Sequence, residues 1–369
     1  MSIPFIDLKT QYEQMKTSID ERIHRVLDHG MYIMGPEVKE CETALAAFTG
    51  TKHANACASG TDALVMALMA LGVGPGDEVI TTSFSFIATA ESIALVGAVP
   101  VFVDVEEDTC NIDVGQIEAA ITTKTKAIMP VSLYGQVADM NEINALAEKH
   151  KLYVIEDAAQ SFGATYEGKR SCNLSTVGCT SFFPAKPLGC YGDGGAVFTN
   201  DDALALKLEQ IRNHGQTERY HHEFLGINGR LDSIQCAVLL TKIEYYADEI
   251  KKRQQVAENY NRAFSSLAEY GVKLPVVRKG RDSVWAQYTL QVPNREGFRS
   301  RLSDAGVPTA VHYPKTMPDQ PAFKNLGRTV KQSMARLLSE KVVSLPMHPF
   351  MDTSTQSQII DAVTRAAKG

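Results

Sequence analysis

The stretch Tyr153-Val154-Ile155-Glu156-Asp157-Ala158-Ala159-Gln160 decides the expected fold, because it places an acidic residue directly after a strand of the buried type. Outward from this stretch, short apolar runs alternate with segments of helical periodicity through the first half of the chain. Helices of crossover length between such strands predict a mostly parallel sheet that is covered on both faces. Ligands bind such sheets at the carboxyl ends of the strands, and Asp157 lies at one of these ends.

The pattern changes near residue 241, where a long charged helical stretch begins. The segment after it combines strand-like and helix-like runs, which is typical of an α+β unit. We therefore expect a large α/β domain with an N-terminal arm over residues 1–241 and a smaller C-terminal α+β domain over residues 242–369. The expected strands are 78–81, 99–103, 126–131, 153–156, 285–292 and 309–312, and the expected helices are 59–71, 88–96, 117–121, 140–150, 242–267, 295–305 and 331–340.

Composition and charge argue against several classes of protein. The 369 residues carry a net charge of -6, whereas nucleic-acid-binding proteins usually show a basic surplus. No apolar run approaches the roughly 20 residues that a membrane span needs, and the first residues do not resemble a secretory signal. Seven dispersed cysteines without a CxxC pair argue against a disulfide framework and favour the reducing cytoplasm. His214, His221 and His222 show no repeated ligand spacing, so we expect no metal.

A lysine followed by a proline stands in the stretch Ser181-Phe182-Phe183-Pro184-Ala185-Lys186-Pro187-Leu188-Gly189, which is aromatic and uncharged apart from that lysine. In a partly apolar pocket an amine loses its proton more readily and becomes a nucleophile that can form an imine with an aldehyde. Taken alone, the stretch favours a solvated loop lysine instead. The choice therefore depends on the other motifs.

Three further motifs lie where strands are expected to end, and each has an ordinary structural alternative. Asp157 could hold a protonated ring nitrogen of a cofactor, or it could cap the following helix. Ser59-Gly60-Thr61 opens a helix and could bind a phosphate through exposed N–H groups, although serine and threonine are also common caps. Phe86 could stack on a cofactor ring, although most such phenylalanines belong to the core.

The order of these motifs along the chain is more specific than any one of them. A phosphate-binding turn, a stacking aromatic residue, an aspartate with Gln160 three residues later, and a serine five residues before Lys186 follow one another. This order resembles the fold-type I pyridoxal-phosphate enzymes, and more narrowly the DegT or StrS family of sugar aminotransferases. The resemblance extends from Phe5-Ile6-Asp7-Leu8 to Met347-His348-Pro349 and includes Gly192-Asp193-Gly194-Gly195.

The resemblance implies a role for each matching residue. Lys186 would carry pyridoxal 5'-phosphate as a Schiff base and act as the catalytic residue. Asn228, in the segment 226–232, would reach the phosphate bound by the neighbouring subunit, which implies a homodimer with shared active sites. The other cofactor-binding residues would be Gly60, Thr61 and Ser181 at the phosphate, Phe86 on the ring face, Asp157 at the pyridine nitrogen and Gln160 near the ring hydroxyl.

Three segments, 28–33, 168–176 and 308–314, narrow the resemblance to aminotransferases that make UDP-2,3-diamino-glucuronates. Their substrate is UDP-2-acetamido-2-deoxy-3-oxo-glucuronate, a precursor of bacterial surface polysaccharide such as O-antigen. The implied substrate-binding residues are Gly30, Tyr32, Arg230, His312 and Tyr313. A uronate and a diphosphate suit an arginine fork, although Arg230 could instead pair with Asp232 or Glu223 across an interface, and His312 could be a core residue.

The implied reaction is a ping-pong transamination in which L-glutamate gives its amino group to the cofactor and the keto sugar then receives it. Lys186 would move the proton as general base and acid. A dTDP- or UDP-linked 3- or 4-keto-6-deoxyhexose is the alternative substrate. Sugar dehydratases on this scaffold have histidine where Lys186 stands, and a non-catalytic sugar sensor would not need Asp157, Gln160 and Lys186 together. Ala185 replaces a serine that touches substrate in some relatives, so any contact there comes from the backbone.

Overall fold

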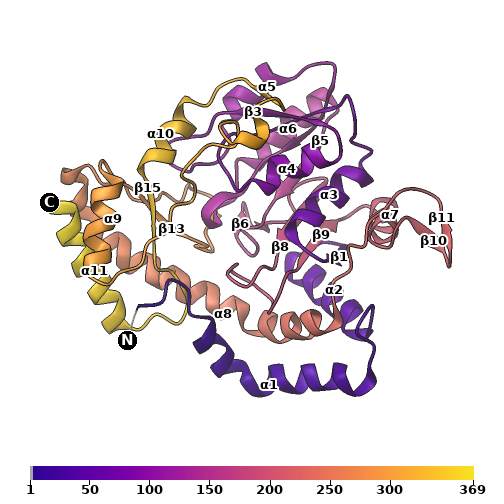
Figure 1. The fold of residues 1–369 in the computed structure, drawn as a ribbon, viewed down its shortest axis with the longest axis horizontal. Coiled ribbons are helices and arrows are strands. Elements are labelled where there is room, and N and C mark those ends of the chain that lie inside the picture. Colours follow the sequence, from indigo (N-terminus) through magenta and orange to yellow (C-terminus); the bar gives the residue numbers. More distant parts are fainter. Residues whose placement is uncertain (1–2) are drawn as a thin grey trace.

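The computed structural model describes residues 3–369 and is built around an eight-stranded sheet (Figure 1). In spatial order the strands are β1 (His53–Cys57), β9 (Gly195–Thr199), β8 (Val177–Ser181), β5 (Tyr153–Asp157), β4 (Thr125–Met129), β2 (Glu78–Thr82), β3 (Val99–Val103) and β14 (Arg328–Thr329). All neighbouring pairs from β8 to β14 are parallel, whereas β9 runs antiparallel to both β1 and β8. The predicted mostly parallel α/β sheet is therefore confirmed.

The sheet is apolar on both faces, as a sheet between two helical layers must be. Successive side chains of a strand point to opposite faces, so Val79 joins the cluster under α3, α4 and α7, whereas Ile80 joins the cluster under α5 and α6. Ile155 and Val154 divide in the same way on β5. The helices are α3 (Gly60–Ala70), α4 (Ala88–Leu95), α5 (Ile117–Ala120), α6 (Met140–His150) and α7 (Asp202–Arg212).

The longest helix, α8 (Ser233–Phe264), links the large sheet to the C-terminal part of the chain. Figure 1 shows it below the sheet, where it packs against α1 (Leu8–His29) and α2 (Pro36–Thr49). Five short strands form two small separate sheets. One contains β12 (Arg281–Asp282), β6 (Thr165–Tyr166) and β7 (Lys169–Arg170), and the other contains β10 (Gln216–Glu218) and β11 (His221–His222).

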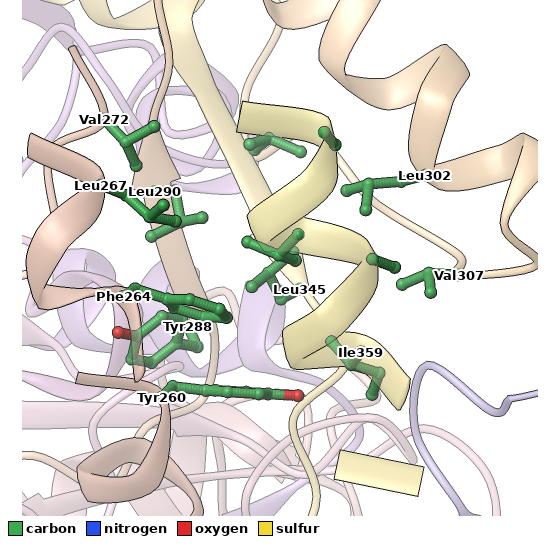
Figure 2. Packing of buried hydrophobic residues seen from close by; sticks show 14 of the residues in the cluster. Tyr260, Phe264, Leu267, Val272, Tyr288, Leu290, Leu302, Val307, Leu345 and Ile359 are labelled. Carbon is green, nitrogen blue, oxygen red and sulfur yellow. The ribbon is translucent and has the colours of Figure 1, made fainter. Parts of the chain in front are cut away.

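The C-terminal part has its own apolar core, in which α8 contributes aromatic side chains (Figure 2). The rings of Tyr260 and Tyr288 lie 4.9 Å apart between centroids, and Leu345 and Ile359 close the cluster. Two antiparallel strands and two further helices contribute to it: β13 (Tyr288–Gln291), β15 (Val342–Leu345), α9 (Arg295–Asp304) and α11 (Thr353–Lys368). Helix α10 (Ser333–Lys341) packs instead into a separate cluster with Phe84 and Leu133.

One predicted strand is wrong. In the segment 309–312 only Ala310 forms a bridge, with Ser344, and β13 pairs instead with β15. The chain leaves the sheet after Ala310, because the carbonyl of His312 accepts a hydrogen bond from Tyr134 and the following residue turns toward another part of the fold. The helix expected at 242–267 begins earlier, at Ser233. The expected boundary between residues 241 and 242 thus lies inside α8, and the division into two domains stays a prediction.

No helix within residues 3–369 is long and apolar enough to cross a membrane.

A buried ion pair fixes strand β1 against two helices. Arg212 at the end of α7 is 1% exposed, and its Nη1 donates to Glu42 on α2 at 2.5 Å and to the carbonyl of Ala56 at 2.7 Å. The same oxygen of Glu42 accepts the N–H of Ala56 at 3.0 Å. This network holds β1 in place, and β1 leads directly into the turn that opens α3.

The substitution Glu42→Ala should lower the free energy of unfolding by about 3–5 kcal/mol, because it leaves the guanidinium of Arg212 buried without a counter-charge. Urea denaturation measures the change. Asp248→Ala is the matched control: it breaks the exposed pair of Asp248 with Lys251 and should cost at most about 1 kcal/mol. Equal losses in the two variants would show that the buried pair does not brace this part of the fold.

Candidate active site

A cavity of about 410 Å³ opens at the carboxyl ends of the central strands. Its lining residues come from the ends of β1, β2, β4, β5 and β8 or from the segments that follow them, as expected for a sheet of this type. Eight of the predicted site residues line it: Gly60, Thr61, Phe86, Asp157, Gln160, Ser181, Lys186 and Tyr313.

One end of the cavity has the properties of an anion site. Helix α3 begins there, and Ser59 caps it by accepting the N–H of Asp62 at 3.0 Å. The N–H groups of the first helical residues, Gly60 and Thr61, have no intrahelical acceptor and carry the positive end of the helix dipole. Gly60 packs so closely on Ser181 that an added Cβ would lie 2.6 Å from the serine Cβ. A phosphate fits this end because backbone donors and a hydroxyl converge on it.

The opposite wall holds a buried carboxylate. Asp157, at the end of β5, is 5% exposed and accepts hydrogen bonds from the Thr89 hydroxyl at 2.7 Å and from the N–H of Ala159 at 3.1 Å. Burial raises the pKa of Asp157, while the two donors and the charge of Lys186 lower it. A carboxylate that is desolvated and faces a cavity favours a cationic partner, such as a protonated ring nitrogen.

Two aromatic rings and an amide form the sides of the cavity. Phe86 is 54% exposed, so it is not a core residue, and its ring centroid lies 6.2 Å from that of Tyr313. Gln160 is buried and bonded on both sides: it accepts the N–H of Tyr134 and donates to the Tyr313 hydroxyl, each at 3.0 Å. These contacts fix a slot in which a flat aromatic group could lie.

Lys186 lines the same cavity from the loop after β8, near enough to Asp157 for the two charges to affect each other. Burial lowers the pKa of its amine, and the nearby Asp157 opposes this effect. A lowered pKa increases the share of the neutral amine, which is the nucleophile that forms an imine. The structure therefore supports a functional lysine in a cavity and not the solvated loop lysine.

The sequence model of the DegT/DnrJ/EryC1/StrS aminotransferase family matches residues 13–364. The chain belongs to this family. It is 56% identical to the UDP-2-acetamido-2-deoxy-3-oxo-D-glucuronate aminotransferase of Pseudomonas aeruginosa, over 98% of this chain and 99% of that protein. A DegT DnrJ EryC1 StrS aminotransferase from Brucella abortus superposes with a TM-score of 0.95 at 43% identity, covering 98% of both chains. NtdA from Bacillus subtilis, solved with bound pyridoxamine phosphate, superposes with a TM-score of 0.93 at 30% identity, covering all of this chain and 86% of the other.

Members of this aminotransferase family depend on pyridoxal phosphate, and so does this chain. The cavity fits the cofactor on three independent grounds. The start of α3 with Gly60 and Ser181 suits the phosphate, the buried carboxylate of Asp157 suits the pyridine nitrogen, and Lys186 suits the aldehyde carbon. When bound, the cofactor supplies an aromatic ring that accepts the electron pair left when a proton leaves an adjacent carbon.

Four of the predicted residues lie together outside the cavity lining. Gly30 ends α1, the carbonyl of Tyr32 accepts the N–H of Ser233 at 2.9 Å, and Asn228 pairs with Asn213. Arg230 bridges to the end of β1 and is half-buried. This group lies beside the phosphate-binding end, because the carbonyl of Gly229 accepts the N–H of Ala58 at 3.0 Å.

Arg230 and His312 differ in how well their polar atoms are paired. Within residues 3–369, Arg230 forms no ion pair with Asp232 or Glu223, and its Nε has no hydrogen-bond partner. Its Nη1 makes one long contact of 3.4 Å with Asn213. His312 is hydrogen-bonded through Nδ1 to Ser344 at 2.9 Å, and burial, aided by the charge of Lys186, lowers its pKa to about 4.

Thr89 and Asp193 also line the cavity, although the sequence did not single them out as site residues. Thr89 lies on the first turn of α4, and its position just after the end of β2, close to Phe86, was the signal that could have found it. Asp193 stands in the glycine-rich motif after the lysine and also lines the cavity. Of the three histidines considered as metal ligands, His221 and His222 lie on the exposed strand β11 and His214 is also exposed. Residues 3–369 contain no group of three or more side chains that could hold a metal ion.

The substitution Thr89→Val should reduce turnover about tenfold to a hundredfold, because the carboxylate of Asp157 loses a charge-assisted hydrogen bond and its pKa rises further. Steady-state kinetics and the dissociation constant of the cofactor measure the effect. Thr43→Val on the exposed face of α2 is the matched control and should leave both quantities unchanged. If the two variants behaved alike, Thr89 would have no part in holding the carboxylate in its ionised form.

Proposed function

We propose that the enzyme transfers the amino group of L-glutamate to the 3-oxo carbon of UDP-2-acetamido-2-deoxy-3-oxo-glucuronate. The product is a UDP-2,3-diamino sugar, which we assign to the synthesis of bacterial surface polysaccharide such as O-antigen, in the cytoplasm. The observation that carries the proposal is the 56% identity, over almost the whole of both chains, to an aminotransferase named for this substrate. The cavity with Lys186 and Asp157 supplies the chemistry that such a reaction needs.

In this proposal the cofactor is held by residues from four strand ends. The backbone N–H groups of Gly60 and Thr61, with the hydroxyl of Ser181, bind the phosphate. Phe86 covers one face of the ring. Asp157 keeps the pyridine nitrogen protonated, because an ionised carboxylate in a desolvated site stabilises a cation strongly. Gln160 lies near the ring hydroxyl and is fixed by its two hydrogen bonds of 3.0 Å, to Tyr134 and Tyr313.

The catalytic work of the protein is proton transfer by Lys186. The amine of Lys186 would remove the proton from the α-carbon of the amino donor as general base and return it as general acid, while the cofactor would supply the electron sink. The steps run in the opposite order when the keto sugar accepts the amino group. The lowered pKa of the lysine suits both directions, because its amine can be neutral before the transfer and protonated after it.

Several residues predicted to bind the sugar nucleotide do not line the cavity of their own chain. We propose that the enzyme is a homodimer, in which the neighbouring subunit supplies these residues. Tyr32 is 48% exposed and stands among the exposed apolar residues Met31 and Ile33, which are typical of a surface that another protein covers. With Gly30 and Arg230 it would bind the substrate of the neighbouring site, and Asn228 would reach the neighbouring phosphate. His312 and Tyr313 would face the sugar from the same chain. The guanidinium of Arg230 suits the uronate carboxylate or the diphosphate.

The second candidate is a dTDP- or UDP-linked 3- or 4-keto-6-deoxyhexose, handled by the same chemistry. It differs from the first candidate at the carboxylate of the sugar, so Arg230 is the residue that discriminates between them. The dehydratase alternative conflicts with Lys186, which occupies the position of a histidine in those enzymes. A sensor without activity would not need the lysine, the carboxylate and the amide that line one cavity.

The reverse half-reaction tests the substrate. Enzyme loaded with pyridoxal phosphate should be converted to its pyridoxamine form by the UDP-2,3-diamino-glucuronate, with the loss of visible absorbance, and far more slowly by dTDP-amino-6-deoxyhexoses. Arg230→Gln should lower kcat/KM for the uronate by about tenfold or more, because a hydrogen bond to a charged group is lost. Arg25→Gln, on the exposed face of α1, is the matched control. If only dTDP-hexoses reacted, the glucuronate assignment would be wrong while the aminotransferase assignment would stand.

A further inference from the structure

A second, much smaller cavity lies on the other side of Lys186. Its volume is about 10 Å³, and Lys186 lines both this space and the large cavity. Its walls come from three distant parts of the chain: the start of α1 with Asp7 and Gln11, helix α8 with Arg253, and the loop before α11 with His348. Lys186 therefore borders two spaces, the large cavity and a small space whose lining includes the polar side chains of Gln11, Arg253 and His348.

The side chains of this small cavity are buried but incompletely hydrogen-bonded. His348 is 2% exposed, and neither of its ring nitrogens has a partner within residues 3–369. Arg253 is 4% exposed; its Nε has no partner, and its Nη1 makes only long contacts of 3.4 Å with the carbonyls of Trp285 and Met347. Gln11 donates to Glu249 at 3.0 Å, which leaves its Oε1 without a donor.

Buried polar atoms without a hydrogen-bond partner lower the stability of the fold, and several of them gather around this one small cavity. Each buried donor or acceptor without a partner costs about 1–3 kcal/mol. The cavity offers at least one N–H donor from Arg253 and one from the neutral ring of His348, together with acceptors on His348 and Gln11. Its volume of about 10 Å³ is close to the minimum that one water requires and too small for a carboxylate or a phosphate.

From this geometry we infer that a single water molecule occupies the small cavity and bridges His348, Arg253 and Gln11 to the amine of Lys186. The water accepts the Nε–H of Arg253 and donates to His348 and to Gln11. It offers its remaining lone pair to an N–H of Lys186, both in the protonated lysine–cofactor linkage and in the free amine. His348 is thus a positioning residue for Lys186. The inference rests on the proposed function, because Lys186 has these two forms only if it carries the cofactor.

This water gives the freed amine a fixed place from which to act. A lysine side chain has four rotatable bonds, and an amine held by a hydrogen bond from behind stays aimed at the reacting carbon in front. The imidazole suits the task as a neutral partner, since burial lowers the pKa of His348 to about 4. The titratable and charged groups around the two cavities are Asp7, Asp157, Lys186, Asp193, Glu249, Arg253, His312, Tyr313, His348 and Asp352.

The substitution His348→Phe removes both ring nitrogens and should exclude the water. In holoenzyme, the pKa read from the visible absorbance of the lysine–cofactor linkage should fall by about one unit, because the protonated linkage loses a polar neighbour. The rate of the half-reaction with L-glutamate should fall about tenfold. His348→Gln keeps one donor and one acceptor and should restore most of both quantities. His24→Phe, at an exposed histidine of α1, is the matched control.

Each outcome decides between positioning and a merely structural role. A shifted pKa and a slow half-reaction in His348→Phe, both rescued in His348→Gln, would support the inference. A wild-type pKa in a folded His348→Phe variant, or a glutamine variant no better than phenylalanine, would overturn it. If the phenylalanine variant does not fold, His348→Gln and a high-resolution crystal structure of wild-type holoenzyme decide, because the absence of a water peak between His348 and Lys186 would also overturn it. A wild-type enzyme without the visible band would refute the proposed function instead.

Discussion

The interaction on which the site depends is the one between the carboxylate of Asp157 and the amine of Lys186 in a cavity of low polarity. Burial raises the pKa of the acid and lowers that of the lysine, so the ionised form of each group is favoured by the opposite charge of the other. The fold brings the two groups together because β5 and β8 are adjacent and parallel, and both therefore end at the same edge of the sheet. The hydrogen bond from Thr89, on the helix after β2, then holds the carboxylate in position.

The rest of the molecule supports this pair from two sides. Beneath the phosphate-binding end, the buried pair of Glu42 and Arg212 braces β1, which delivers Gly60 to its close packing against Ser181. The start of α1, helix α8 and the loop before α11 line the small space that contains His348 and borders Lys186. In the proposed function the amine alternates between bond formation and proton transfer, and rigid surroundings favour this because small displacements of a reacting group reduce the rate steeply.

Much of the fold and of the cavity lining could be predicted from the sequence, because both depend on local periodicity and on residues at strand ends. The residues of β3, Val99–Val103, and of α6, Met140–His150, were predicted with the observed bounds, because regular periodicity and clear turn residues define both. The segment 309–312 was predicted as a strand and is not one, because β-propensity says nothing about the hydrogen bonds that draw His312 and Tyr313 away from the sheet. Eight predicted site residues line one cavity. The small cavity could not be predicted, because Gln11, Arg253 and His348 are far apart in the sequence.

The most direct measurement is the identification of the residue that is covalently linked to the cofactor. Holoenzyme is reduced with borohydride, which makes the linkage permanent, and is then digested and analysed by peptide mass spectrometry. The account predicts that the cofactor is attached to Lys186 and to no other lysine, and that Lys186→Ala shows neither the label nor the visible absorbance. Attachment to a different lysine, or full labelling in Lys186→Ala, would contradict the account at its centre.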